Sequence, residues 1–227
     1  MSLRSPGQGD DSRVLYEKRE LKAIAARWDA KAATWDKELE NPLCHLNEDE
    51  AYAGFIDEVR SVIKDRSHFC ARQGAIDAGC GTGLVLAAVA SSFAWGVGVD
   101  ISGEMIQMAQ AKQISRCRFV VGDCFRLASV CPKAGAVLSR GVLLSHYGPE
   151  HGEALLRAAR EALNPDGFLV CDFLNEAARG TSRHVPENKS YFTAQEAAQM
   201  AVRAGFTRHR VLGPPDRRVL MLFAEVG

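Results

Sequence analysis

Three carboxylates in this sequence stand where short apolar runs end. Asp77 lies at the end of the run 73–78, Asp100 follows 95–99, and Asp123 follows 118–122. Such runs are typical of buried parallel strands, and ligands of parallel sheets bind outside the carboxyl ends of the strands. A carboxylate there can accept two hydrogen bonds from a sugar diol. The pattern therefore predicts a site for a ligand that contains a ribose.

The glycines after Asp77 occupy every second position, as Gly79, Gly81 and Gly83, and a helix-like segment begins at Leu84. Glycine lets the backbone turn tightly and lets a ligand lie against the main chain, because it has no Cβ. The N-terminus of the following helix offers unpaired N–H groups to a carboxylate or phosphate. A dinucleotide-binding turn requires G-x-G-x-x-G, whereas the sixth position here is leucine in both possible frames.

The frame D-x-G-x-G-x-G over residues 77–83 resembles motif I of the class I S-adenosylmethionine (SAM)-dependent methyltransferases. The resemblance extends from about residue 28 to the C-terminus and implies SAM as cofactor and S-adenosylhomocysteine (SAH) as product. In this family the glycine loop wraps the methionyl end of SAM, the acid after strand 2 holds the ribose, and the acid after strand 3 faces the adenine. The next backbone N–H meets the adenine ring, and a carbonyl after strand 4 takes the SAM ammonium. The cofactor-binding residues that this implies are Asp77, Gly79, Cys80, Gly81, Gly83, Asp100, Ile101, Asp123, Cys124, Ser139 and Trp35.

Residues 17–39 carry apolar side chains at helical spacing, so we expect an amphipathic helix there. Within it, residues 27–36 resemble a segment that folds over the cofactor as a lid in many small-molecule methyltransferases. Trp35 stands where the family usually has tyrosine, which keeps an aromatic cover but removes a hydroxyl group. The alternative is that Trp28 and Trp35 only pack the helix on the core, and we favour that alternative for Trp28.

The segment 139–148 follows an expected strand at 134–138 and resembles the part of small-molecule methyltransferases that lines the acceptor site. His146 is the candidate general base, because an unperturbed imidazole titrates near working pH; alternatively, it hydrogen-bonds its own loop. Arg140 is the second catalytic candidate: it either clamps a substrate carboxylate or forms a salt bridge that fixes the loop. The other acceptor-site candidates are Tyr147 and, in the long polar connection 175–192, His184 and Tyr191.

Methyl transfer from a sulfonium is an in-line displacement with a good leaving group. Catalysis is then mainly the alignment of donor and acceptor, with a base only where the acceptor must lose a proton. The sequence lacks the D/N-P-P-Y stretch that marks adenine and glutamine-amide N-methyltransferases. We therefore expect the methyl group to go to an O, N or S atom of a small metabolite.

The composition sets limits on partners and location. The 227 residues include 28 Lys plus Arg and 28 Asp plus Glu, so no overall charge attracts nucleic acid or an anionic membrane. No apolar run has the length of a membrane span, and the N-terminus lacks a hydrophobic signal segment. Seven cysteines without a C-x-x-C pair favour free thiols in a reducing compartment. We expect a cytoplasmic monomer or homodimer that binds a small-molecule acceptor and no metal.

Strand-like runs alternate with helical segments along most of the chain. This predicts an α/β fold: a Rossmann-like, mostly parallel seven-stranded sheet with helices on both faces and an N-terminal helical lid. Asn47, Ser102 and Thr193 are expected helix N-caps, Thr193 in a capping box with Glu196. The single domain divides into a disordered tail (1–16), a helical lid (17–65), a cofactor-binding core (70–175), and an acceptor loop with the last helix and closing strands (176–227).

The sequence thus predicts a SAM-dependent methyltransferase, with two alternatives left open. A SAM-binding regulatory or scaffold protein without turnover would keep the same cofactor residues. A NAD-dependent oxidoreductase is disfavoured, because the third glycine of its turn is missing and no basic residue near Asp77 could pair with a pyrophosphate.

Overall fold

The computed structural model describes residues 18–40, 51–141, 143–146, 148–180 and 189–227. These residues form one seven-stranded sheet with the order β3-β2-β1-β4-β5-β7-β6. Neighbouring strands from β3 to β5 are parallel, whereas β7 is antiparallel to both β5 and β6. The predicted fold class is confirmed. The strands are β1 (Gly74–Ala78), β2 (Trp95–Asp100), β3 (Cys117–Val121), β4 (Ala134–Ser139), β5 (Leu163–Leu174), β6 (Arg208–Leu212) and β7 (Val219–Glu225).

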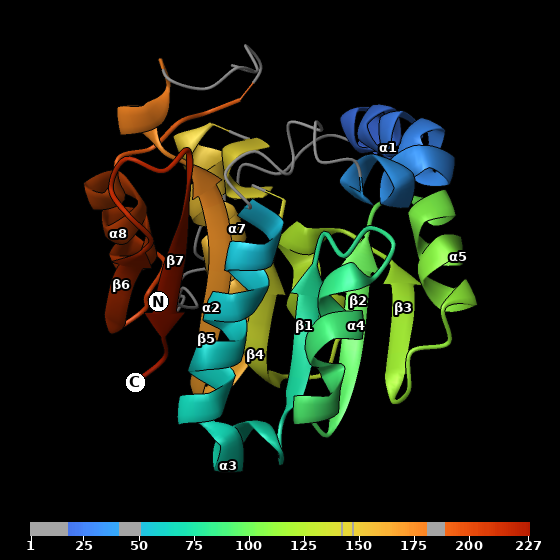
Figure 1. Cartoon of the computed structure of the whole chain (residues 1–227), viewed down its shortest axis with the longest axis horizontal. Coiled ribbons are helices and arrows are strands. Elements are labelled where there is room, and N and C mark those ends of the chain that lie inside the picture. The colour runs from blue at the N-terminus through green and yellow to red at the C-terminus, as the bar shows by residue number, and fades with distance from the viewer. Residues whose placement is uncertain (1–17, 41–50, 142, 147, 181–188) are drawn as a thin grey trace, which may run out of the picture.

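Helices cover both faces of the sheet, because successive strand residues point to opposite sides and both sides are apolar. One core contains Val97, Val137 and Leu169, and it is closed by α6 (Leu127–Val130), α7 (Pro149–Glu161) and α8 (Ala194–Arg203). The other core contains Ala136 and Phe168, and it is closed by α2 (Ala51–Asp65), α3 (Ser67–Cys70), α4 (Leu84–Val89) and α5 (Gly103–Ala111). Figure 1 shows α2 and α4 in front of the sheet, with α7 behind it.

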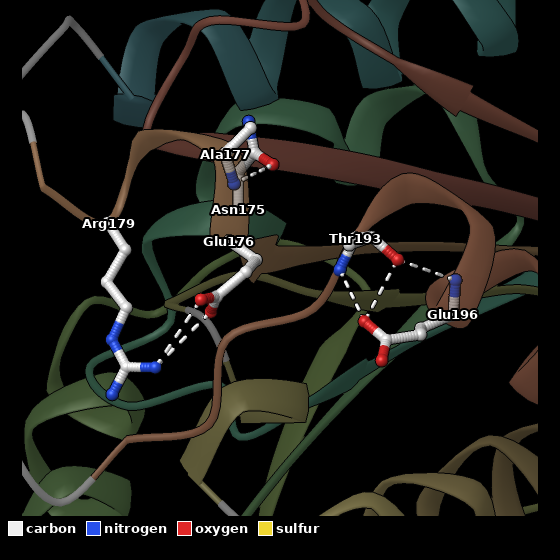
Figure 2. Close-up of polar contacts among 6 residues, drawn as sticks. All are labelled: Asn175, Glu176, Ala177, Arg179, Thr193 and Glu196. Carbon is white, nitrogen blue, oxygen red and sulfur yellow. Dashed lines mark hydrogen bonds and ion pairs between the residues drawn. The ribbon is translucent and has the colours of Figure 1, made fainter.

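Two of the expected helix starts are present as local hydrogen-bond motifs. The Ser102 hydroxyl accepts a hydrogen bond from the backbone N–H of Met105 at 3.1 Å and caps α5. Thr193 and Glu196 form the expected capping box of α8, in which the Glu196 N–H donates to Thr193 Oγ1 at 3.1 Å and the Thr193 N–H donates to Glu196 Oε2 at 2.8 Å (Figure 2). The third expected cap, Asn47, lies outside the described residues.

The segment expected to form a lid divides into two helices with different positions. α1 (Lys18–Glu40) lies across one end of the sheet beside α5 (Figure 1). α2 belongs instead to the core, because Phe55, Ile56 and Val59 form an apolar face that is buried against the sheet. Only the first part of the predicted lid, 17–65, therefore lies where a lid could act.

β5 has an irregular start before its main apolar run at 168–173. Leu163 pairs with Ala134, and the register then shifts before Phe168 pairs with Ala136. Residues 164–167 form this irregular part of the strand, where Asp166 has a φ of 61°. The preceding helix, α7, ends at Glu161, and β5 begins two residues later at Leu163.

The connection after β5 is held by polar contacts at both of its ends. Asn175 Oδ1 accepts a hydrogen bond from the Ala177 N–H at 3.2 Å, and the Glu176 carboxylate pairs with Arg179 at 3.4 Å (Figure 2). At the far end, the Phe192 N–H donates to the Leu174 carbonyl at 2.9 Å. Both ends of this long loop are thus anchored beside the end of β5.

Candidate active site

A pocket of about 970 Å³, open solvent at its mouth included, lies between α1 and the carboxyl ends of β1, β2 and β4. Its position agrees with the rule that ligands of parallel sheets bind beyond the carboxyl ends of the strands. Of the predicted site residues, the following line it: Gly79, Cys80, Gly81, Asp100, Ile101, Asp123, Cys124, Trp35, Arg140 and His146.

The glycine loop presents bare backbone to the pocket. Gly79, Gly81 and Gly83 have φ values of 73°, 50° and 83°, which other residues adopt only with strain. A Cβ added at Gly81 would lie 3.6 Å from Trp35 Nε1 and 3.9 Å from Met105 Sδ, two groups whose residues line the same pocket. Gly81 thus leaves a space that a side chain would fill, which is what a ligand lying on this loop requires.

Gly83 has a different role from the one predicted for it. It does not line the pocket, and a Cβ there would lie 2.9 Å from the Phe119 ring. Glycine at this position lets α4 start close to β3, so Gly83 supports the site through packing.

Asp100 is held in place by the loop that it faces. Its two carboxylate oxygens accept hydrogen bonds at 2.9 Å from the backbone N–H groups of Gly81 and Ser102. Burial raises the pKa of Asp100, and these hydrogen bonds act in the opposite direction. Because a carboxylate oxygen can accept more than one hydrogen bond, the group can still bind a diol.

Asp77 is buried behind the pocket wall. Within the described residues neither of its carboxylate oxygens has a hydrogen-bond partner, and its exposed fraction is 0%. Burial and the nearby Asp100 raise its pKa to about 8. Ser139 is also buried and does not line the pocket, since its hydroxyl donates to the Ala78 carbonyl at 2.9 Å.

The far end of the pocket is formed by the chain after β3. Asp123 Oδ1 accepts a hydrogen bond from the Phe125 N–H at 2.9 Å, which orders the turn carrying Cys124. Burial raises the pKa of the Cys80 and Cys124 thiols well above the ordinary value, so both stay protonated at neutral pH. We therefore assign them no nucleophilic role.

α1 is fastened to the cofactor side of the pocket by two acids. Asp29 accepts hydrogen bonds from the Ser102 hydroxyl at 2.6 Å and from the Glu104 N–H at 3.1 Å, at the start of α5. Asp36 accepts one from the Thr82 hydroxyl at 2.5 Å and pairs with Lys112 at 2.7 Å. The helix thereby covers the glycine loop from above.

The opposite side of the pocket contains Arg140 and His146. The Arg140 guanidinium lies 4.5 Å from the centre of the Tyr52 ring. The His146 ring stacks on Trp28 with centroids 5.6 Å apart and 3° between the planes. Burial lowers the pKa of His146 to about 3, and the cations Lys189, Arg27 and Lys31 act in the same direction. The imidazole is therefore neutral at physiological pH.

The structure does not bring every predicted acceptor residue to the pocket. Tyr191 does not line it; the Arg179 guanidinium lies 4.9 Å above its ring, and the neighbouring Phe192 is buried beside β5. Because Phe192 is fixed by its pairing with Asn175, Tyr191 is held in that corner of the fold. Tyr147 and His184 lie outside the described residues.

Sequence reasoning missed several residues of the pocket wall. Trp28 was expected to pack on the core, yet it lines the pocket together with Trp35, and the two rings make an edge contact at 5.6 Å. The seven-residue spacing puts both tryptophans on one side of the helix, so this signal was available. Tyr52 and Leu143 had no comparable signal.

Within the described residues, no group of three or more His, Cys, Asp or Glu could hold a metal ion.

Comparisons with known proteins agree with this geometry. Residues 75–167 match the Methyltransf_25 family, described as a methyltransferase domain. Among curated proteins, none matches the sequence. Solved structures similar to this one include magnesium protoporphyrin IX methyltransferase (ChlM) from Synechocystis PCC 6803 with bound SAH, at 18% identity and a TM-score of 0.70 over 91% of this chain and 100% of that chain.

Two further solved structures are similar to this one, one in complex with SAH and one in complex with an activator protein. The DhpI–SAH complex has 16% identity and a TM-score of 0.64 over 91% of this chain and 97% of that chain. A methyltransferase in complex with the Haloferax volcanii Trm112 activator has 18% identity and the same TM-score over 88% and 97%. Residues 75–167 therefore match a methyltransferase domain, and the fold of the chain is that of the class I SAM-dependent methyltransferases. The predicted enzyme class is confirmed.

Proposed function

We propose that this protein transfers a methyl group from SAM to an O, N or S atom of a small metabolite. One observation carries the proposal: a single pocket joins a glycine loop and two strand-end acids, Asp100 and Asp123, to a second set of polar groups, Arg140 and His146. The first set suits a nucleoside with a bound amino acid, and the second suits a reaction partner. Similar structures hold SAM or SAH.

The residues of this chain would bind the cofactor, exclude water and accept a proton in the following way. SAM, when bound, supplies an activated methyl group on a sulfonium. Asp100 would hold a ribose diol, Asp123 would face the adenine, and the glycine loop would lie against the methionyl part. α1, with Trp28 and Trp35, would exclude water from the reacting atoms. His146, neutral and beside the acceptor space, would take a proton only from an acceptor that must lose one.

A small acceptor is favoured by the apolar and aromatic side chains around this space. Trp28, Tyr52 and Leu143 line the pocket, and a folded protein or nucleic acid would have to reach the reacting atoms past them. The neighbour ChlM is named for a small molecule, magnesium protoporphyrin IX. No helix of the described residues is both long and apolar enough to cross a membrane. Cytoplasmic location and a monomeric or dimeric state remain part of the proposal.

Calorimetry tests which cofactor the protein binds, and formation of SAH from SAM tests whether it is an enzyme. SAM and SAH should bind with micromolar affinity and NAD far more weakly; tighter binding of NAD would overturn the cofactor assignment. A panel of small carboxylates, amines and phenols should then yield SAH when incubated with SAM. Tight SAH binding without turnover of any acceptor would favour the alternative of a SAM-binding scaffold.

A further inference from the structure

Four charged residues of α1 lie on two different sides of the helix. Asp29 and Asp36, seven residues apart, bind the start of α5 and the glycine loop. Arg27 and Lys31, four residues apart, lie at the Trp28 ring, with Arg27 Cζ 5.4 Å and Lys31 Nζ 5.3 Å from its centre. Residues separated by four or seven share one side of a helix. The acids thus face the cofactor side, and the bases face the stacked Trp28 and His146.

A third cation comes from a distant part of the chain. Lys189, just before the buried Phe192, is half-buried, and its ammonium is close enough to Arg27 and Lys31 for both to lower its pKa, after burial, to about 7. We call Arg27, Lys31 and Lys189 the basic cluster. Within the described residues none of the three forms an ion pair with a carboxylate, whereas Asp29 and Asp36 are both engaged elsewhere.

The basic cluster has an electrostatic cost that a bound anion would remove. Arg27 and Lys31 are exposed and Lys189 is half-buried. Like charges brought together disfavour one another, and all three also act on the His146 ring. A cleft lined by one sign of charge and low-dielectric walls concentrates ligands of the opposite sign. The three cations do not themselves line the pocket, but Arg27 and Lys31 lie at the Trp28 ring, which forms the pocket's aromatic wall together with His146 and Tyr52.

We propose, on the basis of the methyltransferase function above, that the acceptor carries an anionic oxygen group on an apolar or aromatic body. The basic cluster would hold the anionic group at the pocket mouth, and the body would lie against Trp28 and the apolar side chains Leu21, Ile24 and Leu143. A carboxylate and a phosphate share this chemistry. This inference assigns the acceptor a negative charge. The cofactor-binding residues alone say nothing about the charge of the acceptor.

The test compares matched probes on the SAH complex. Benzoate, phenyl phosphate and neutral benzamide share one aromatic body, and their binding to the SAH-saturated protein is measured by ligand-observed NMR. We expect one or both anions to bind roughly tenfold or more tightly than benzamide, with the stronger of the two identifying the group. The variant R27Q/K31Q/K189Q should lose most of that preference.

Two controls separate the possible failures. Lys22→Gln removes one positive charge from the opposite side of α1 from Lys31, at an exposed residue, and should leave the preference intact. SAH affinity, measured on every variant, should not change, because the basic cluster does not line the cofactor side. Equal binding of benzamide and the anions, no binding of either anion, or a preference that survives in R27Q/K31Q/K189Q would overturn the inference. Failure to bind SAH would instead overturn the proposed function.

Discussion

At the residue scale, the environment of His146 changes what this side chain can do. The sequence suggested a base with an ordinary pKa, whereas burial and three cations lower the pKa to about 3. A neutral imidazole carries a lone pair on one nitrogen and can accept a proton. Because the His146 pKa is low, protonation would remove the base only in strongly acidic solution, so the base form persists across the usual assay range.

His146→Gln should lower kcat by much less than the roughly 10²–10⁴ that a general base with a pKa near the working pH contributes, because an imidazole with a pKa of about 3 is a weak base. The SAM affinity should stay nearly the same. In the wild-type enzyme, kcat should not fall as the pH is lowered from about 8 to 5. Steady-state kinetics at saturating acceptor measures both effects. A wild-type kcat that halves near the ordinary histidine pKa, about 6.5, would contradict the assigned environment.

The buried Asp77 predicts an unusual pH dependence of stability. Its folded-state pKa is about 8 and its unfolded value about 3.9, so the folded state favours the protonated acid. The contribution to stability is complete below the unfolded pKa and is lost as the pH rises toward the folded pKa. Asp77→Asn mimics the protonated form and should raise the free energy of unfolding near pH 8, by at most a few kcal/mol.

Urea denaturation at pH 5 and pH 8, without cofactor, measures this effect. The gain from Asp77→Asn should be larger at pH 8 than at pH 5. Asp216→Asn, at an exposed turn position, serves as the control and should show no such difference. A variant that is less stable than the wild type at pH 8 would mean that the Asp77 carboxylate is stabilised by groups outside the described residues.

At the scale of secondary-structure elements, α1 is the part that joins the proposed cofactor and acceptor sides of the pocket. Its attachment relies on few polar contacts, and the Asp36–Lys112 pair is about one-quarter exposed, with side-chain exposed fractions of 29% and 27%. Such a pair contributes only about 1 kcal/mol or less. We therefore expect the helix to open locally more easily than the sheet.

Asp36→Asn should weaken SAH binding by roughly fivefold, because the helix loses its ion pair with Lys112 and the cover over the cofactor opens more often. In the wild type, hydrogen exchange across residues 28–35 should be slower with SAH than without it. In the variant, SAH should slow this exchange by a smaller factor. Lys37→Gln, at an exposed position on α1, is the matched control. Equal protection with and without SAH would show that α1 is permanently docked.

At the scale of the whole molecule, ligand binding and folding should be linked through the sheet. The pocket is formed by loops that leave several strands, so it is lost when the domain unfolds. SAH at one hundred times its Kd should therefore add about 2.7 kcal/mol to the free energy of unfolding. Thermal unfolding with increasing SAH checks this, and NAD at the same concentrations should leave Tm unchanged. An equal shift with NAD would point to a general nucleotide site.

The sequence by itself determined the fold class and the cofactor side of the pocket. The glycine spacing at 79–83 and the acids Asp100 and Asp123 are local signals, because each combines a strand end with the turn that follows it. The same holds for the caps at Ser102 and Thr193. Short-range backbone preferences and hydrogen bonds decide such features, so they can be recognised from neighbouring residues alone.

Only the tertiary structure decided the acceptor side. It placed Trp28 on His146, gathered Lys189 beside Arg27 and Lys31, and held Tyr191 away from the pocket. These residues belong to segments far apart in the chain, and no spacing rule connects them. Burial and long-range charges set their positions and pKa values, because both depend on which surfaces the completed fold brings together.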